Sequence, residues 1–227
     1  MIRTPWRIWW GWPERVIQAE LASLAGRPVS YGTPPATPTS ASGWTVERFQ
    51  ALLGYEPVGP PLANGLFARA SAGVAAYRFA DPRLTRGHFD PSAPLLGRDM
   101  LIEIRPLFVR LLVGLRVGDV LNRPGGPDEP VSRFGVRMDT LDGHILDGSE
   151  WVRIVKDHRS GAVRFHIDVQ WRAGHLPTWW MALGFQLFGR QIQVRWRRLA
   201  VLRLRRLGQA GELRQSAPTE AAARPRA

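Results

Sequence analysis

The stretch AVRFHIDVQW, residues 162–171, decides the fold class, because its apolar and polar residues alternate without a break. The apolar positions are Val163, Phe165, Ile167, Val169 and Trp171, and the polar positions are Arg164, His166, Asp168 and Gln170. Successive side chains of a β-strand point to opposite faces of the sheet. The pattern therefore predicts a strand with one face in the core and one polar face in solvent.

The segments that precede this strand extend it into an antiparallel sheet. Residues 150–155 form a strand that pairs with it around the loop 157–161, whose Gly161 supplies the positive φ that a hairpin exit needs. Alternating runs also occupy residues 100–105, 107–117 and 134–138. Because no rhythm of strands and crossover helices appears, we expect consecutive strands to be antiparallel.

A long helix follows the last strand, from Pro177 to Leu207, and Gly208 is expected to end it. One apolar stripe, expected to dock on the sheet, consists of Met181, Phe185, Phe188, Ile192, Trp196 and Leu199. A second apolar row consists of Leu183, Leu187, Val194 and Val201. This second face implies another contact, and the N-terminal extension, a second copy of the chain or a membrane are the alternatives. The fold class is α+β.

Residues 1–60 are expected to form a Trp-rich extension with two short helices, over about 13–25 and from Thr45 to Leu53. A Pro/Ser/Thr linker over 27–43 separates them. The four Trp residues between positions 6 and 12 are expected to cover the second apolar row of the long helix, with membrane contact as the alternative. Residues 61–208 form the main domain, with a helix over 65–79, and residues 209–227 are expected to be a disordered tail.

The 227 residues carry 31 Lys and Arg against 19 Asp and Glu, a formal net charge of +12. Eight of these charges are arginines between Asp168 and Glu212, a stretch without any acid. The residues expected to face an anion are Arg190, Arg195, Arg197 and Arg198. One interpretation of these arginines is a positive helix face that is solvated or packed against a partner. The other is a polyanion, of which an anionic membrane is the favoured one, since Trp residues accompany the arginines and no nucleic-acid-binding motif does. Nucleic acid is therefore disfavoured.

Several classes of chemistry are excluded by missing residues and motifs. The chain has no cysteine, which excludes disulfides and thiolate nucleophiles. No histidine has a partner at metal-ligand spacing, and no P-loop, dinucleotide fingerprint or nucleophile elbow is present, so we expect no metal and no cofactor. The longest uncharged stretch, 173–189, contains Gly174 and Pro177. We expect a cytoplasmic protein, at most peripheral to a membrane.

Three stretches together resemble one family: AYRF at 76–79, FGVRMDTLDGHILDGSEWV at 134–152 and KDHRSGAVRFHIDVQWRAGHLPTWWMALGF at 156–185. They are similar to the DUF1990 family over about residues 64–207. The matching positions are Phe134, Gly135, Thr140, Leu141, Gly143, His144, Gly148, Glu150, Arg172, Gly174, Trp179 and Trp180. Many members carry two acids after the glycine, whereas this chain has Ser149 before Glu150.

The resemblance implies a fold of the START or Bet v 1-like superfamily. In this helix-grip fold, a strongly curved antiparallel sheet wraps around a long C-terminal helix and encloses an apolar cavity. A hydrophobic or lipid-like small molecule is then the expected ligand. The side chains expected to line the cavity are Phe134, Trp151, Phe165, Trp171, Trp180 and Phe185.

The best candidates for chemistry are His144 and Glu150, which share one hairpin with glycines at 143 and 148. A hydrogen bond between imidazole and carboxylate would suit acid–base work in a cyclase-like or hydrolase-like enzyme. The alternative is that His144 only fixes its own loop through backbone hydrogen bonds. Non-enzymatic ligand binding is the favoured function, with catalysis and peripheral binding to an anionic membrane through the last helix as alternatives.

Overall fold

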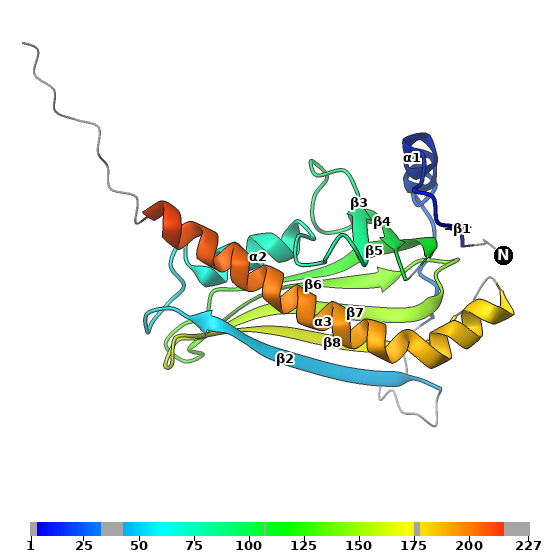
Figure 1. Cartoon of the computed structure of the whole chain (residues 1–227). Helices are drawn as coiled ribbons and strands as arrows, with labels where there is room; N and C mark the ends of the chain where they lie inside the picture. Colours follow the sequence, from blue (N-terminus) through cyan, green and yellow to red (C-terminus); the bar gives the residue numbers. More distant parts are fainter. Residues whose placement is uncertain (1–3, 33–42, 107, 175–177, 216–227) are drawn as a thin grey trace, which may run out of the picture.

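Within the part of the chain that the structure describes, eight strands form one antiparallel sheet that curves around the long helix α3 (Figure 1). The structure is a computed structural model that describes residues 4–32, 43–106, 108–174 and 178–215, and the backbone alone of residues 179–188 and 209–215. Seven strands follow the order β2-β8-β7-β6-β5-β4-β3, and the short β1 pairs with the start of β5. The expected α+β helix-grip architecture is confirmed.

The strand predictions over residues 134–138, 150–155 and 162–171 fall within three neighbouring long strands, β6 to β8. The bounds of the eight strands are β1 Trp6–Ile8, β2 Thr45–Tyr55, β3 Thr85–His88, β4 Asp99–Ile104, β5 Val109–Arg123, β6 Val131–Thr140, β7 Leu146–Asp157 and β8 Ala162–Ala173. The register places Ile167 of β8 opposite Val152 of β7, and Val152 opposite Val136 of β6. Side chains opposite one another share a face, so this row lies in the core.

In the described residues, three helices accompany the sheet: α1 over Glu14–Ala22, α2 over Leu66–Ala75 and α3 over Trp179–Gln215. Helix α3 crosses the concave face, and α2 lies beside its C-terminal half (Figure 1). Two glycines allow this close approach. A Cβ on Gly73 of α2 would come within 2.9 Å of a Leu207 methyl, and one on Gly208 of α3 would overlap Leu66.

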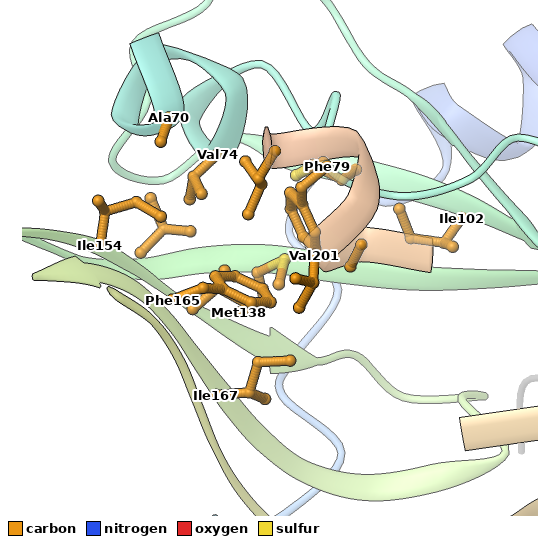
Figure 2. Packing of buried hydrophobic residues seen from close by; sticks show 14 of the residues in the cluster. Ala70, Val74, Phe79, Ile102, Met138, Ile154, Phe165, Ile167 and Val201 are labelled. Atoms are coloured by element: carbon orange, nitrogen blue, oxygen red, sulfur yellow. The ribbon is translucent and has the colours of Figure 1, made fainter. Parts of the chain in front are cut away.

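The main core fills the space between α2, the second half of α3 and the sheet (Figure 2). Phe79 is fully buried at its centre, with ring centroids 5.0 Å from Tyr77, 6.1 Å from Phe165 and 5.9 Å from Trp196. Ala70 and Val74 of α2 and Val201 of α3 point into the same cluster (Figure 2). The chain is therefore solidly packed at this end of the sheet.

A buried ion pair ties the connection between β2 and α2 to β7. Lys156, the single lysine of the chain, has no exposed surface, and its Nζ donates to Glu56 Oε2 at 2.7 Å and to the Pro60 carbonyl at 3.0 Å. The backbone N–H of Phe67, in the first turn of α2, donates to Glu56 Oε1 at 2.6 Å. Glu56 therefore serves both the lysine and the N-terminus of α2.

The predicted helix from Thr45 to Leu53 is wrong, because this segment forms the edge strand β2, paired with β8 over its whole length. Its inward residues are Glu47, Phe49, Ala51 and Leu53, a period of two that a short apolar run also allows as a helix. Pairing with β8 overrides the helical reading. Residues 45–55 therefore belong to the sheet and not to an N-terminal extension.

The N-terminal segment packs elsewhere than expected. Helix α1 confirms the first predicted helix, and its Ile17 and the following Leu24 cover Leu101, Leu112 and Leu141 on the sheet face opposite α3. The expectation that this segment covers the second apolar row of the long helix is wrong. One member of that row, Val201, is instead buried in the main core.

The expected end of the long helix at Gly208 is also wrong, since α3 continues to Gln215. Gly208 is buried in the contact with α2, so its missing side chain serves packing and not a helix stop. The rest of the predicted tail, residues 216–227, lies outside the described residues, as do Leu107 and Pro177.

Candidate functional site

A cavity of about 480 Å³ lies between the sheet and the first half of α3. It begins where the main core ends, so that Ile102, Val113 and Ile167 touch both. The apolar part of its wall comprises Leu84, Ile102, Ile104, Pro106, Phe108, Val109, Leu111, Val113, Leu115, Met138, Ile145, Leu146, Ile167, Val169, Trp171, Ile192 and Trp196. A wall of this composition and volume is typical of a site for a small, mainly apolar ligand.

Glu150 places a carboxyl group in this apolar wall. It lies on the inward face of β7, opposite Met138 of β6 and Val169 of β8. Its Oε1 is fully buried and makes no hydrogen bond with the described residues. Burial raises the pKa of Glu150 to about 7, against a lowering influence of Arg197 and a raising one of Glu47. Glu150 therefore exchanges its proton near neutral pH.

Arg197 of α3 connects Glu150 to the edge of the sheet. Glu47 of β2 and Glu150 of β7 flank Val169 in one row of the register, and strand spacing sets them about 10 Å apart. Arg197 lines the cavity, forms an ion pair with Glu47 and lies 5.8 Å from the ring centroid of Phe49. Arg197 thus forms an ion pair with Glu47 and acts on Glu150 only through its charge.

Tyr77 supplies a second polar group at this end of the cavity. Burial and the charge of Glu150 raise its pKa well above the usual value, and Thr85 hydrogen-bonds to it. The indole N–H of Trp196 donates to the Thr85 hydroxyl at 3.0 Å. Tyr77 adopts φ 53°, a left-handed conformation that is uncommon for a tyrosine. The polar end of the cavity is thereby built by side chains from α3, β3, β7 and the segment after α2.

His144 lines the same cavity, but its Nδ1 contacts the backbone of its own loop. The backbone N–H of Leu146 donates to His144 Nδ1 at 2.9 Å, and the Leu146 carbonyl lies 2.8 Å from the same nitrogen. Burial lowers its pKa to about 4, although the contact with the Leu146 backbone opposes the change. The ring is therefore neutral at pH 7.

The structure does not pair His144 with Glu150. Among the described residues no hydrogen bond joins them, and the neighbours that shift the pKa of Glu150 are Arg197 and Glu47. Gly148 between them shapes the hairpin, because a Cβ there would overlap the Gln170 carbonyl oxygen. Ser149 accepts a hydrogen bond from Gln170, a residue of the outward row of β8. Ser149 nevertheless lies among the residues that line the cavity.

Of the six side chains expected to line the cavity, Trp171 does so. Phe165 lies fully buried in the main core, and Phe134 packs at the margin of that core. Trp151 lies on the opposite face of β7 from Glu150, in a surface groove with Asp119 and Arg153, because adjacent strand residues alternate. The side chains of Trp180 and Phe185 lie outside the described residues.

The four arginines expected to face an anion do not share one environment. Arg190, Arg195 and Arg198 are exposed on α3, whereas Arg197 is largely buried by Glu47 and the cavity. Arg205 is turned toward the sheet, where it donates to the Leu52 carbonyl at 2.7 Å. Some arginines of α3 therefore face solvent, whereas Arg197 and Arg205 bind groups of β2.

Sequence reasoning missed Glu47 and Tyr77 as parts of the site, and it predicted Arg197 as a residue that faces an anion and not as part of the cavity wall. Glu47 falls within the helix expected from Thr45 to Leu53, and Tyr77 falls within the helix expected over 65–79. The useful signal was the alternation of Glu47, Phe49 and Ala51, which places an acid on an inward strand face.

The described residues lack a metal-binding cluster and a membrane-spanning helix. They contain no cluster of three or more His, Asp or Glu side chains that could hold a metal ion. No helix in the described part of the chain combines the length and apolar character needed to cross a bilayer.

Residues 30–201 match a family described as a domain of unknown function, DUF1990. The chain belongs to this family. The DUF1990 match includes β2 and the cavity, and it leaves β1 and α1 outside. None of the curated proteins matches the chain.

Three solved structures resemble this DUF1990 protein at low identity. Ara h 8.0201 is 11% identical, with a TM-score of 0.40 over 74% of this chain and 99% of that one. A point mutant of norcoclaurine synthase from Thalictrum flavum, in complex with a transition-state analogue, is 8% identical, with a TM-score of 0.42 over 76% and 97%. An uncharacterized protein from Rhizobium leguminosarum is 15% identical, with a TM-score of 0.33 over 72% and 98%. None of them assigns a ligand to this chain.

Proposed function

We propose that the protein binds a small, mainly apolar molecule in the cavity between the sheet and α3. The observation that carries the proposal is a volume of about 480 Å³ with an apolar wall and one polar end. Ligand pockets of roughly 300–1,000 Å³ with few polar groups are common in small-molecule binders. Apolar surface removed from water on binding supplies the driving force.

The polar end defines which part of the ligand is recognised. Glu150 Oε1 is buried without a hydrogen-bond partner among the described residues, and Tyr77 and Arg197 line the same cavity. A ligand with one hydrogen-bonding group and an otherwise apolar body would satisfy Glu150 and fill the rest of the cavity. An entirely apolar ligand would leave Glu150 unsatisfied, at a cost of roughly 1–3 kcal/mol.

The test is saturable binding of a fluorescent fatty-acid probe to the purified chain, with mass spectrometry of any molecule that co-purifies. Leu115→Trp fills the cavity from β5 and is expected to weaken probe binding at least tenfold. Leu202→Trp is the matched control, since Leu202 is exposed on α3. Equal binding by both variants, together with no co-purifying molecule, would refute the proposal.

A second candidate function, acid–base catalysis on the bound molecule, is favoured by one observation. Glu150 is buried in the cavity and its pKa of about 7 suits a general acid or base at neutral pH. His144 would not share the work as an acid, because burial keeps its ring neutral. In a cyclase-like or hydrolase-like reaction, Glu150 would transfer the proton and Tyr77 would orient the ligand.

Conversion of the co-purifying molecule by the intact chain, followed by mass spectrometry, tests this second function. Glu150→Gln keeps the shape of the side chain and is expected to abolish conversion while probe binding persists. Conversion that survives in Glu150→Gln and is lost in His144→Ala would overturn the assignment. Binding without conversion in the parent chain leaves the first function and refutes the second.

A further inference from the structure

The N-terminal segment presents a cluster of exposed aromatic and aliphatic side chains. This aromatic patch consists of Trp6, Ile8, Trp9, Trp10 and Phe108, and Trp9 and Trp10 are 72% and 74% exposed. The ring of Trp9 stacks on Phe108 at a centroid distance of 5.5 Å. Large apolar side chains grouped on a surface in this way mark a binding face.

The patch is held in place by the backbone. Strand β1 pairs with β5 through Trp6–Leu111 and Ile8–Val109, and the N–H of Trp9 donates to the Phe108 carbonyl at 2.8 Å. Trp9 has φ 66°, a left-handed conformation that L-residues adopt only where neighbouring contacts impose it. The exposed indole is therefore presented by a fixed turn that the neighbouring hydrogen bonds impose.

The patch adjoins the cavity of the proposed binding site. Phe108, Val109 and Leu111 line that cavity, and Phe108, which is 39% exposed, belongs to both the patch and the cavity wall. Thr4 donates to the Gly143 carbonyl, which places the N-terminal segment next to the His144 loop. Four of the five patch residues, all except Phe108, lie outside the DUF1990 match, which covers residues 30–201.

The charge of the segment that carries the patch favours an anionic partner. The first acid of the chain is Glu14, and Arg7 is the cross-strand neighbour of Arg110 in the β1–β5 register, on the face of β1 opposite to Trp6 and Ile8. The Arg7 guanidinium also lies 5.3 Å from the ring centroid of Trp12. Tryptophan combined with arginine is typical of segments that sit at the interface of an anionic bilayer. A second copy of this chain would bring another net charge of +12 to the same place.

We propose that the aromatic patch docks the protein on an anionic lipid bilayer, with the Phe108 side of the cavity turned toward the membrane. The inference goes beyond the proposed function: an apolar ligand would enter from the bilayer instead of crossing water. It moves the membrane contact from the arginines of α3 to the N-terminal segment, because α3 turns its described tryptophan, Trp196, inward.

Flotation of the full chain with vesicles of phosphatidylcholine, with and without 30% phosphatidylserine, tests the proposal. Binding is expected only with phosphatidylserine and is expected to weaken with salt. Trp9→Ala with Trp10→Ala should lower the partition coefficient more than tenfold, and Arg7→Gln about fivefold. Trp10→Ala alone keeps the Trp9–Phe108 stack and should still weaken binding, which separates docking from folding.

The matched control is Tyr55→Ala with Val58→Ala, which removes exposed apolar side chains elsewhere and should leave vesicle binding unchanged. Vesicle binding that is equal in the tryptophan variants and the parent would overturn the proposal. So would a concentration-dependent dimer that the tryptophan substitutions abolish. Probe binding without vesicles is expected to survive these substitutions, so failure of the membrane proposal and failure of the cavity proposal are distinguishable.

Discussion

Glu150→Gln is expected to stabilise the protein at pH 8 and to leave its stability nearly unchanged at pH 4.5. Burial raises the pKa of Glu150 from 4.5 to about 7 in the folded chain. Each pH unit of displacement is worth about 1.4 kcal/mol, so ionising this carboxyl group in the fold costs about 3 kcal/mol. Glutamine keeps the size of the side chain and removes the charge.

The direction in which the free energy of unfolding changes with pH follows from the number of protons that the folded and unfolded chains bind. Between pH 4.5 and 7 the folded chain holds the Glu150 proton and the unfolded chain has released it, so the free energy of unfolding falls as the pH rises. His144 acts in the opposite direction, because burial lowers its pKa from 6.5 to about 4 and stability is lost as the pH falls through this range. In the parent chain the two dependences oppose each other between pH 4.5 and 6.5.

Urea denaturation of the two chains at half-unit steps from pH 4.5 to 8 measures the difference. The gain from Glu150→Gln should rise from near zero to at most about 3 kcal/mol, and the variant should lose stability below pH 6.5, where the opposing dependence of Glu150 is gone. Other titrating groups cancel in the difference. Glu14→Gln, on the exposed side of α1, is the control. A difference that is constant over the whole range would refute a buried, neutral Glu150.

Three further predictions concern His144, the buried lysine and the helix contact. His144→Gln should remove part of the stability loss between pH 6.5 and 4, measured by thermal melts, whereas an unchanged acid profile would show that this ring is not the group concerned. Lys156→Met should cost about 3–5 kcal/mol in urea denaturation by leaving Glu56 buried and unpaired, and a loss below 1 kcal/mol would contradict this. Gly208→Ala should cost about 1–3 kcal/mol by overlap with Leu66, and adding Leu66→Ala should make the glycine substitution nearly neutral, since the overlapping methyl is then gone.

The parts of the fold that the sequence predicted are those where local pattern and tertiary packing agree. Strand β8 alternates without interruption, and its inward side chains are core or cavity wall along its length. The helix predicted over residues 45–53 was wrong because the few apolar residues of this segment satisfy both a period of two and a helical spacing. Only pairing with the partner strand β8 decides between a strand and a helix. The helix end predicted at Gly208 was wrong because a glycine after an apolar stripe is equally suited to a helix end and to a close contact between helices.

The candidate site was predictable only in part, for a related reason. Glu150 was found as an acid beside a glycine in a hairpin, yet its importance comes from apolar side chains brought by β5, β8 and α3. Trp151 was expected in the cavity on the strength of its ring, although its position next to Glu150 on a strand puts it on the other face. Tyr77 carried no signal of its own, because its contact with the site depends on the left-handed turn after α2.

Strands β7 and β8 each have one half that packs in the core and one half that lines the cavity. On β7, Val152 and Ile154 are fully buried beneath α2 and α3, whereas Glu150, two residues earlier, faces a cavity. On β8, Phe165 fills the core and Val169 and Trp171 line the cavity. The packed half supplies the stability that lets the other half form a cavity of about 480 Å³ and hold a carboxyl group that costs about 3 kcal/mol to ionise. A leucine or methionine at position 150 would avoid that cost, so the proposed contact of Glu150 with a ligand group would give this carboxyl group a function that an apolar side chain could not perform.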